Sequence, residues 1–169
     1  MHDELTKGDI QKMQEELDYR RTTLRPKLLE EVKTARAFGD LSENFEYKAA
    51  KQEKNRNESR IRFLENMIKT AVVVDEVSSD DSDGIGLYDK VTIYIPDDDD
   101  EETFQIVTTM RQDVLSGLVS KESPVGKALL GRHVGDQVHI QVNEKAGYDA
   151  VIRSVEKGQD EDSIPLSGY

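Results

Sequence analysis

Along the first part of the chain, large apolar residues recur at spacings of three, four or seven positions. This narrow stripe is typical of a helix in a coiled coil and predicts one long helix over roughly residues 6–38. Thr6 is a suitable N-cap for this helix, and Gly39 suits the left-handed position at which many helices end. The stripe consists of Ile10, Met13, Leu17, Leu24, Leu28, Val32 and Ala35.

A second apolar stripe predicts a further helix that begins near Leu41. Only Gly39 and its neighbours separate the two helices, and so short a connection makes successive helices antiparallel neighbours. The first half is therefore predicted to be a helical hairpin, and the pattern alone favours a dimerisation or spacer element. The second stripe consists of Ile61, Leu64, Ile68 and Ala71.

Two features interrupt this hairpin. Pro26 lies inside the first helix, where it removes a hydrogen bond, so we expect a bend near Thr22 or a new helix with Pro26 at its first position. Residues 51–60 include no large apolar side chain. Because this stretch lies opposite residues 20–28 in the predicted hairpin, we expect the middle of the hairpin to be weakly packed.

The second half changes to a period of two, which predicts short strands of a half-buried sheet. The six acids from Asp97 to Glu102 are expected to form a solvated turn rather than a calcium site, which would need glycine and spaced ligands. Ser123, Pro124 and Gly131 signal the N-cap, the first position and the end of a single short helix. The alternating positions are Val91, Ile93 and Ile95, then Phe104 and Ile106, then Val138, Ile140 and Val142, and finally Val151 and Val155.

These elements predict an α+β protein of two parts. The first, over residues 1–75, is an N-terminal antiparallel α-helical coiled-coil hairpin. The second, over residues 76–157, is a small α+β domain. Residues 158–169 are polar and unpatterned, so we expect them to form a loose tail.

Charge divides the chain in the same place. Residues 1–74 hold 15 Lys and Arg against 14 Asp and Glu, whereas residues 75–169 hold 8 against 21. With a formal net charge of −12, free-standing binding to duplex nucleic acid is not expected. The absence of cysteine excludes disulfide scaffolds, thiolate zinc sites and cysteine nucleophiles. No apolar stretch suits a membrane span or a signal peptide, so we expect a cytoplasmic protein without membrane contact.

At the predicted tip of the hairpin, Asp40 and Glu43 stand three residues apart, and this spacing supports two interpretations. In the first, Asp40 caps the second helix and Glu43 is its third residue, an arrangement of the capping-box kind that the helix dipole favours. In the second, the two carboxylates share a Mg²⁺ ion, which takes only one or two protein carboxylates and completes its shell with water and substrate phosphate. Alone, the pair would hold a metal ion only weakly.

The tip residues Gly39-Asp40-Leu41-Ser42-Glu43-Asn44-Phe45-Glu46-Tyr47 closely resemble the tip signature of the Gre transcript-cleavage factors, GreA and GreB. The second landmark of that family, Ser-Pro-x-x-x-Ala-Leu-Leu-Gly-x-x-x-Gly-Asp, is matched here by Ser123, Pro124, Ala128, Leu129, Leu130, Gly131, Gly135 and Asp136. The resemblance covers roughly residues 5–157 and implies that the second domain is FKBP-like.

The resemblance implies a factor that docks on bacterial RNA polymerase with its second domain and inserts the hairpin through the secondary channel. Asp40 and Glu43 would help to hold the second Mg²⁺ of the polymerase active site, so that a backtracked transcript is cut near its 3′ end. The chain would then be a monomeric catalytic cofactor without nuclease activity of its own. The residues implied to support the tip are Gly39, Leu41, Ser42, Asn44, Phe45, Glu46 and Tyr47, and the candidates for contact with the RNA 3′ end are Arg20, Arg21, Arg25 and Lys27.

Three alternatives stay open on the sequence. A Gre-like paralogue would occupy the same channel and regulate or inhibit the polymerase without cleavage. A peptidyl-prolyl isomerase is disfavoured, because its pocket needs a lining of aromatic side chains. The second half has no Trp, a single Phe (Phe104) and the tyrosines Tyr88, Tyr94, Tyr148 and Tyr169. A coiled-coil scaffold would self-associate through the hairpin and would be indifferent to substitutions at the tip.

Overall fold

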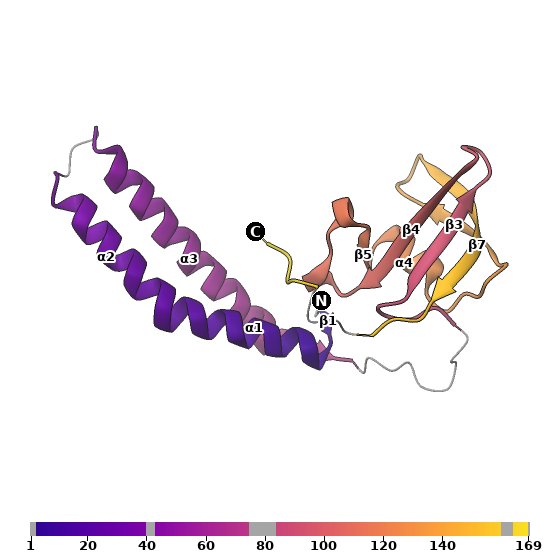
Figure 1. The fold of residues 1–169 in the computed structure, drawn as a ribbon, viewed down its shortest axis with the longest axis horizontal. Helices are drawn as coiled ribbons and strands as arrows, with labels where there is room; N and C mark the ends of the chain where they lie inside the picture. The colour runs from indigo at the N-terminus through magenta and orange to yellow at the C-terminus, as the bar shows by residue number, and fades with distance from the viewer. Residues whose placement is uncertain (1–2, 40–42, 75–83, 160–163, 169) are drawn as a thin grey trace. The chain divides into compact units, whose positions relative to one another are not determined.

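The computed structural model describes residues 3–39, 43–74, 84–159 and 164–168 (Figure 1). The chain forms two compact units. Residues 10–71 make up most of the first, whereas the second combines residues 3–9 with the described part of 72–168. The predicted boundary after residue 75 therefore does not hold for the N-terminal segment, which belongs with the second unit.

The first unit is the predicted helical hairpin (Figure 1). Its first arm runs through α1 (Lys7–Tyr19), a π-helical segment η1 (Arg20–Leu24) and α2 (Arg25–Arg36), and its second arm is α3 (Phe45–Thr70). Positions of both predicted stripes are buried, as expected for the facing sides of a coiled coil. They include Leu17, Leu28, Ala35, Ile61 and Leu64.

The segment η1 lies directly before Pro26. The Arg25 N–H donates to the Arg20 carbonyl, five residues back, so the helix is wider here than a regular α-helix. In a regular helix Pro26 would lack a donor and its ring would crowd the carbonyl of Thr22. The wider turn relieves this conflict, and the predicted restart is found, although α2 begins at Arg25 and Pro26 therefore occupies its second position rather than its first.

Polar side chains join the two arms in the middle of the hairpin. Arg60 is buried and donates to both carboxylate oxygens of Glu16, at 2.7 and 3.3 Å. Arg20 donates to Glu16 at 3.1 Å and to Asn57 at 2.9 Å. Burial alone would raise the pKa of Glu16, but hydrogen bonding and charge from Arg60 and Arg20 lower it below its ordinary value. Charged hydrogen bonds thus replace the weak packing that was expected for residues 51–60.

A five-stranded mixed sheet forms the centre of the second unit. Its strands are β3 (Lys90–Ile95), β4 (Asp100–Val107), β5 (Leu118–Ser120), β6 (Gln137–Gln141) and β7 (Gly147–Glu156), in the spatial order β5-β4-β3-β7-β6. Neighbouring strands are antiparallel except β4 and β5, and the predicted strands are confirmed. β4 is longer than predicted, because Asp100 already pairs with Ile95 and the turn takes in only the first three of the six acids.

The short helix α4 (Pro124–Leu129) packs against the sheet through the buried Leu129. The Ser123 hydroxyl accepts from the Gly126 N–H at 3.0 Å, and Gly131 has a φ of +78°, so both predicted ends of the helix are confirmed. Gly126 has a steric role, because a Cβ there would lie 2.2 Å from the Ser120 carbonyl oxygen. The core under α4 includes Val91, Ile93, Ile106, Ile140 and Ile152.

The N-terminal segment is fastened to the second unit. Strand β1 (Glu4–Leu5) pairs in parallel with β2 (Val72–Val73). Thr6 is confirmed as the N-cap of α1, since its hydroxyl accepts from the Asp9 N–H at 3.1 Å while Asp9 accepts from the Thr6 N–H at 3.0 Å. The same Asp9 carboxylate accepts from Arg111 Nε at 2.5 Å and from the Thr108 hydroxyl at 2.6 Å, and no part of the Asp9 or Arg111 side chain is exposed.

The described part of the C-terminal segment also packs on the second unit. Ile164 is buried against Tyr88 and Val107, and the Gly158 N–H donates to Asp89 at 3.0 Å. These contacts differ from the loose tail that was predicted, because one apolar side chain in a polar stretch is enough to fasten the chain. In the ranges that the structure describes, the helices lack any segment whose length and hydropathy would suit passage through a bilayer.

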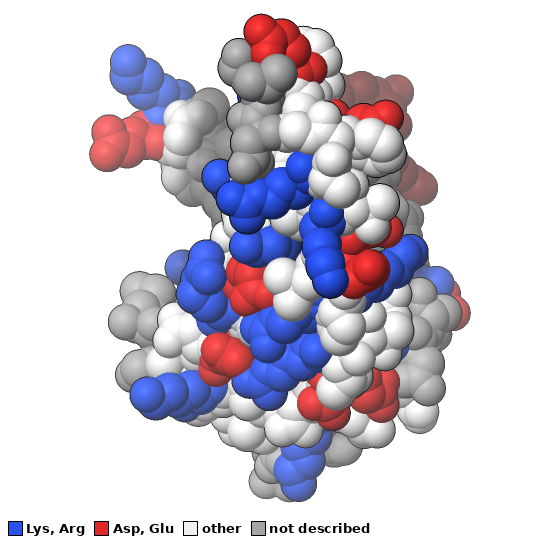
Figure 2. Space-filling view, turned by 90° about the vertical axis from the view of Figure 1, so that its left-hand side faces the viewer, with Lys and Arg blue, Asp and Glu red and all other residues white. Residues whose placement is uncertain are grey.

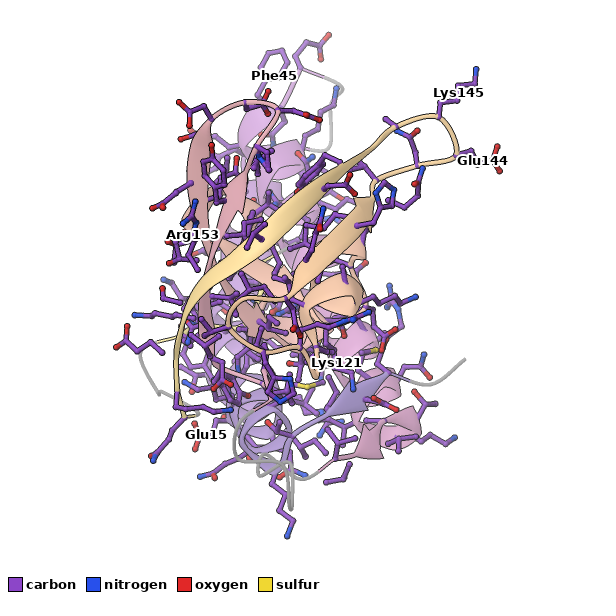
Figure 3. All side chains as sticks on the ribbon, turned by 90° about the vertical axis from the view of Figure 1, so that its right-hand side faces the viewer. Glu15, Phe45, Lys121, Glu144, Lys145 and Arg153 are labelled. Atoms are coloured by element: carbon purple, nitrogen blue, oxygen red, sulfur yellow. The ribbon has the colours of Figure 1, made fainter. Side chains whose placement is uncertain are left out.

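Strands β6 and β7 form a hairpin whose turn carries Glu144 and Lys145 (Figure 3). On β6, His139 Nδ1 lies 2.8 Å from Asp149 Oδ1, and Nε2 lies 2.7 Å from Gln141 Oε1. The hydrogen bond to Asp149 and then that to Gln141 raise the pKa of His139 above its ordinary value.

This raised pKa is expected to make stability depend on pH. The contribution of His139 is fully present below the unfolded-state pKa of about 6.5 and is lost as the pH rises through the folded-state pKa. Urea titrations across that interval should therefore show the wild type losing stability relative to His139→Gln. The imidazole shift in NMR checks the direction of the pKa change, and a parallel pH dependence of the two proteins would contradict the prediction.

Candidate catalytic tip

The hairpin tip lies between the end of α2 and the start of α3. The first arm ends through short backbone bonds, in which Phe38 N–H donates to Ala35 O at 3.2 Å and Gly39 N–H to Arg36 O at 3.0 Å. Gly39 has a φ of +123°, a conformation that L side chains rarely adopt, but α2 already ends at Arg36, earlier than the predicted end at Phe38. Asp40, Leu41 and Ser42 lie outside the described residues. Of the predicted acidic pair, the structure describes Glu43.

Glu43 is exposed in a turn just before α3. Its position beside the N-terminus of a 26-residue helix is favourable for a carboxylate, because the helix dipole places positive partial charge there. Within the described residues, Glu43 forms no ion pair and no group of three or more His, Asp or Glu side chains is arranged to hold a metal ion. Because its side chain is exposed, Glu43 is accessible to a group outside the chain.

Asn44 holds the two arms together at the tip. Its Nδ2 donates to the Ala35 carbonyl at 3.0 Å and to the Gly39 carbonyl, while its Oδ1 accepts from the Tyr47 N–H at 3.0 Å. One side chain thus closes the end of the first arm and caps the second. Sequence reasoning placed Asn44 only among the tip neighbours. The signal that was missed is that Asn ranks with Asp as an N-cap and also carries two donors.

This geometry corrects the capping-box interpretation. α3 begins at Phe45 with Asn44 as its N-cap, four residues later than predicted, so Glu43 precedes the helix instead of occupying its third position. A capping box at the start of α3 therefore does not explain the spacing of Asp40 and Glu43. Their arrangement as a metal-binding pair stays a prediction.

Aromatic side chains flank this turn. Phe38 and Phe45 are each 75% exposed, and the Lys48 ammonium lies 5.7 Å from the centre of the Phe45 ring. Tyr47 lies in the first turn of α3, and the Arg36 guanidinium lies over its ring, 5.9 Å from the ring centre. Glu46, in the same turn, is exposed. The tip therefore presents acidic and apolar groups to the outside, with cations on both arms behind them.

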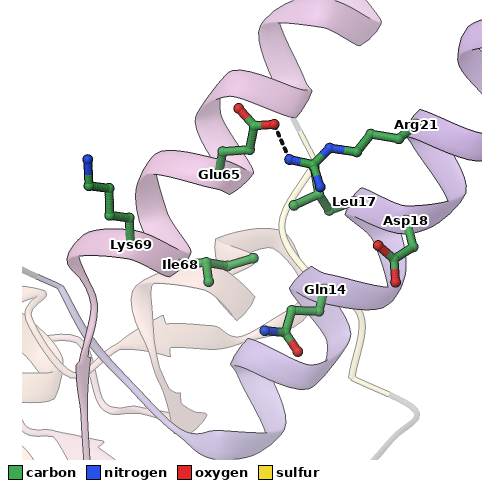
Figure 4. Close-up of a pocket in the computed structure, with 7 residues that line it drawn as sticks. All are labelled: Gln14, Leu17, Asp18, Arg21, Glu65, Ile68 and Lys69. Carbon is green, nitrogen blue, oxygen red and sulfur yellow. Dashed lines mark hydrogen bonds and ion pairs between the residues drawn. The ribbon is translucent and has the colours of Figure 1, made fainter.

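The structure places three of the four RNA-contact candidates in ion pairs. Arg20 is held by Glu16 and Asn57, Arg25 donates twice to Glu58 at 2.8 and 2.9 Å, and Arg21 pairs with Glu65. Lys27 is exposed on α2. The Arg21–Glu65 pair borders a pocket whose other lining residues are Gln14, Leu17, Asp18, Ile68 and Lys69 (Figure 4).

A second set of cations, which sequence reasoning missed, lies nearer the tip. Lys48, Lys51 and Arg56 line a shallow groove along α3 together with Gln52, Asn55 and Ser59. Figure 2 shows Lys and Arg side chains gathered over the face that it presents, with Asp and Glu among them. The signal in the sequence is the recurrence of polar and basic residues three and four positions apart, which places them on one side of a helix.

The motif in the second unit mainly builds the fold. Ser123 and Pro124 start α4, and Ala128, Leu129 and Leu130 pack on the core. Gly131 and Gly135 have φ values of +78° and +92°, which only glycine adopts readily. The Asp136 carboxylate accepts from the His133 N–H at 2.9 Å and so fixes the turn before β6.

Replacing Asn44 by Asp is expected to weaken the hairpin while keeping the cap. Asp retains the oxygen that accepts from Tyr47 but loses the two N–H donors, so stability should fall by about 1 kcal/mol, the usual net value of a hydrogen bond. Asn44→Ala loses the cap as well and should cost more. Urea unfolding followed by far-UV circular dichroism measures both, and equal stability of Asn44→Asp and wild type would show that the donors contribute nothing.

Comparisons with known proteins identify the family. The chain matches two family models, described as transcription elongation factor, N-terminal, over residues 4–73 and transcription elongation factor, GreA/GreB, C-term, over residues 80–157. Among solved structures, GreA factor homolog 1 (Gfh1) of Thermus thermophilus is 28% identical with a TM-score of 0.43, covering 93% of this chain and 100% of that one.

Two relatives cover most of the chain. Transcription elongation factor GreA of Geobacillus kaustophilus is 45% identical over 137 residues, which are 81% of this chain and 86% of that protein. Transcription elongation factor GreA of Staphylococcus carnosus is 36% identical over 152 residues, which are 90% of this chain and 94% of that protein. With both halves matched in order, the chain belongs to the GreA/GreB family of transcription elongation factors.

Proposed function

We propose that this elongation factor inserts its hairpin into the secondary channel of bacterial RNA polymerase and stimulates the polymerase's own Mg²⁺-dependent cleavage of backtracked RNA. Arrested complexes would then resume from a new 3′ end. The observation that carries this proposal is the exposed Glu43, three residues after Asp40, on a tip that Asn44 closes.

The tip residues suit a shared metal ion. Mg²⁺ accepts one or two protein carboxylates and keeps its other positions for water and phosphate, which fits a pair that the rest of the described chain does not complete. When bound, such an ion supplies Lewis acidity and lowers the pKa of a coordinated water. The role of Asp40 and Glu43 would be to hold and orient this ion, and the polymerase would provide its remaining ligands. The chain alone is therefore expected to show no nuclease activity.

The length of the hairpin supports this proposal. The 26 residues of α3 extend about 39 Å at 1.5 Å per residue. Its middle is cross-linked by charged hydrogen bonds that Arg60, Arg20 and Arg25 donate across the two arms, and these bonds resist separation of the arms. A long arm with a closed tip is suited to carrying two carboxylates to a distant site.

The cations behind the tip are the better candidates for RNA contact. Arg20 and Arg25 already satisfy acidic partners within the hairpin, so binding phosphate would require those pairs to open. Lys51 is exposed in the groove on α3, and Lys27 is exposed on α2. Exposed cations attract the phosphate backbone without reading its sequence, as a contact with any transcript 3′ end requires.

The test is cleavage of labelled RNA in a stalled, backtracked elongation complex of bacterial RNA polymerase. We expect the protein to increase the release of 3′ fragments in the presence of Mg²⁺, and to leave the same RNA intact when polymerase is omitted. A protein that slows elongation without releasing fragments would instead be a channel-occupying Gre-like paralogue. A protein that neither cuts nor slows elongation would contradict both functions.

A further inference from the structure

A short turn of the second unit presents two adjacent apolar side chains to the outside. It is the 3₁₀ segment η3 (Val114–Ser116), in which Val114 is 77% and Leu115 100% exposed. Scattered exposed apolar residues are common on proteins. Here, however, the two are neighbours on one protruding turn, so they form a continuous apolar surface.

This turn is held rigidly. Asp113 and Leu118 exchange backbone hydrogen bonds at 2.8 and 2.9 Å at its base, and the Ser116 hydroxyl donates to the Asp113 carboxylate at 2.8 Å. Gly117 closes the turn with a φ of +76°. A rigid apolar contact loses little conformational entropy on binding, which favours it as an anchor in an interface.

The C-terminal segment braces the chain just before this turn. The Ser167 N–H donates to the Met110 carbonyl at 2.6 Å and its hydroxyl donates to the Gln112 carbonyl at 2.8 Å. Ile164 fastens the same segment by its burial against Tyr88 and Val107. We call residues 164–168 the strap. The two family matches cover residues 4–73 and 80–157, so the strap lies outside both of them.

Charge restricts the kind of partner that fits. Asp113 adjoins the turn, and residues 75–169 together hold 21 acidic against 8 basic side chains. Such a surface repels nucleic acid and also a second copy of itself. It favours a protein surface on which an apolar socket is surrounded by Lys and Arg.

We propose that the Val114–Leu115 turn, braced by the strap, is a docking contact of the second unit with such a socket on RNA polymerase. This proposal rests on the proposed function, which requires the factor to bind the polymerase. It adds to it a residue-level anchor and a role for the C-terminal segment.

The first experiment replaces both apolar residues, as Val114→Ser/Leu115→Ser. Because these side chains are exposed, the fold should be retained, which circular dichroism checks. Affinity for purified polymerase should fall about tenfold or more, as expected when a buried leucine and valine are removed from an interface. The matched control is Val142→Ser, which removes a 52% exposed valine at the end of β6 and should leave affinity unchanged.

Cleavage titrations separate docking from chemistry at the tip. For Val114→Ser/Leu115→Ser, the concentration for half-maximal cleavage should rise about tenfold while the rate at saturation stays that of the wild type. If the wild type binds polymerase and the variant binds it with the same affinity, the docking contact is overturned but the proposed function is not. Failure of the wild type to bind polymerase would overturn the proposed function and this contact with it.

A second variant tests the strap. A chain that ends after Gln159 should show faster amide hydrogen exchange in residues 109–118 and weaker polymerase binding, with the sheet still protected. Unchanged exchange and affinity would remove the strap from the proposal. Sedimentation of the wild type and of Val114→Ser/Leu115→Ser tests a competing interpretation, in which the turn is a self-association contact. A wild-type dimer that the substitutions dissociate would support that interpretation and overturn the docking to polymerase.

Discussion

Replacing Asp40 by Asn together with Glu43 by Gln should abolish stimulated transcript cleavage while leaving polymerase binding intact. The substitutions keep the size of both side chains and remove both charges. If the pair holds Mg²⁺, loss of its charge should lower the cleavage rate by at least about a hundredfold, because a Lewis-acid metal contributes several kcal/mol to such a reaction. Gel analysis of labelled RNA in backtracked complexes measures the rate.

The fold of this variant should survive for a reason that only the structure supplies. Asn44 caps α3 and ties Ala35 to Tyr47 through its own side chain, so α3 keeps its cap when Glu43 changes. A matched control is Glu30→Gln/Glu31→Gln, which removes two exposed acids from α2. If the control and the tip variant lost cleavage equally, hairpin charge in general would be responsible and the metal-binding role of the tip would be refuted.

Removing the Asp9 carboxylate is expected to have the largest effect on stability. In Asp9→Asn the Arg111 guanidinium, which is fully buried, would keep its charge but lose the Asp9 carboxylate that faces it. Breaking a buried ion pair from one side typically costs about 3–5 kcal/mol. That is a large share of the roughly 5–15 kcal/mol by which a domain is stable, so urea unfolding should shift strongly.

The control for Asp9→Asn is an ion pair of the same type at the surface. Glu65→Gln breaks the pair with Arg21, in which both side chains are about two-fifths exposed, and exposed pairs contribute only about 0–1 kcal/mol. In the double variant Asp9→Asn/Arg111→Met the buried positive charge is gone as well, so part of the lost stability should return. Equal costs for Asp9→Asn and Glu65→Gln would mean that the Asp9–Arg111 pair is not buried in solution.

The order of elements could be predicted from the sequence because each signal is local. Apolar residues three and four apart predicted the hairpin, alternation predicted four of the sheet strands, and Ser123 with Pro124 predicted α4. Pro26 predicted the irregularity at η1 for the same reason, since the missing donor and the crowded carbonyl lie within one turn. The tip acids were found through their resemblance to a family signature, because their spacing alone favoured a capping box.

What the sequence left undecided depends on contacts between residues far apart in the chain. Asp9 contacts Arg111, 102 positions away, and Ile164 contacts Tyr88, so segments near both ends of the chain belong to the second unit although neither carries a periodic pattern. The ion pairs of Arg20, Arg25 and Arg60 likewise form only when the arms are in register. Local propensity and spacing determine helices, strands and caps, whereas partners for polar side chains are decided by packing, which alone brings distant charges within bonding distance.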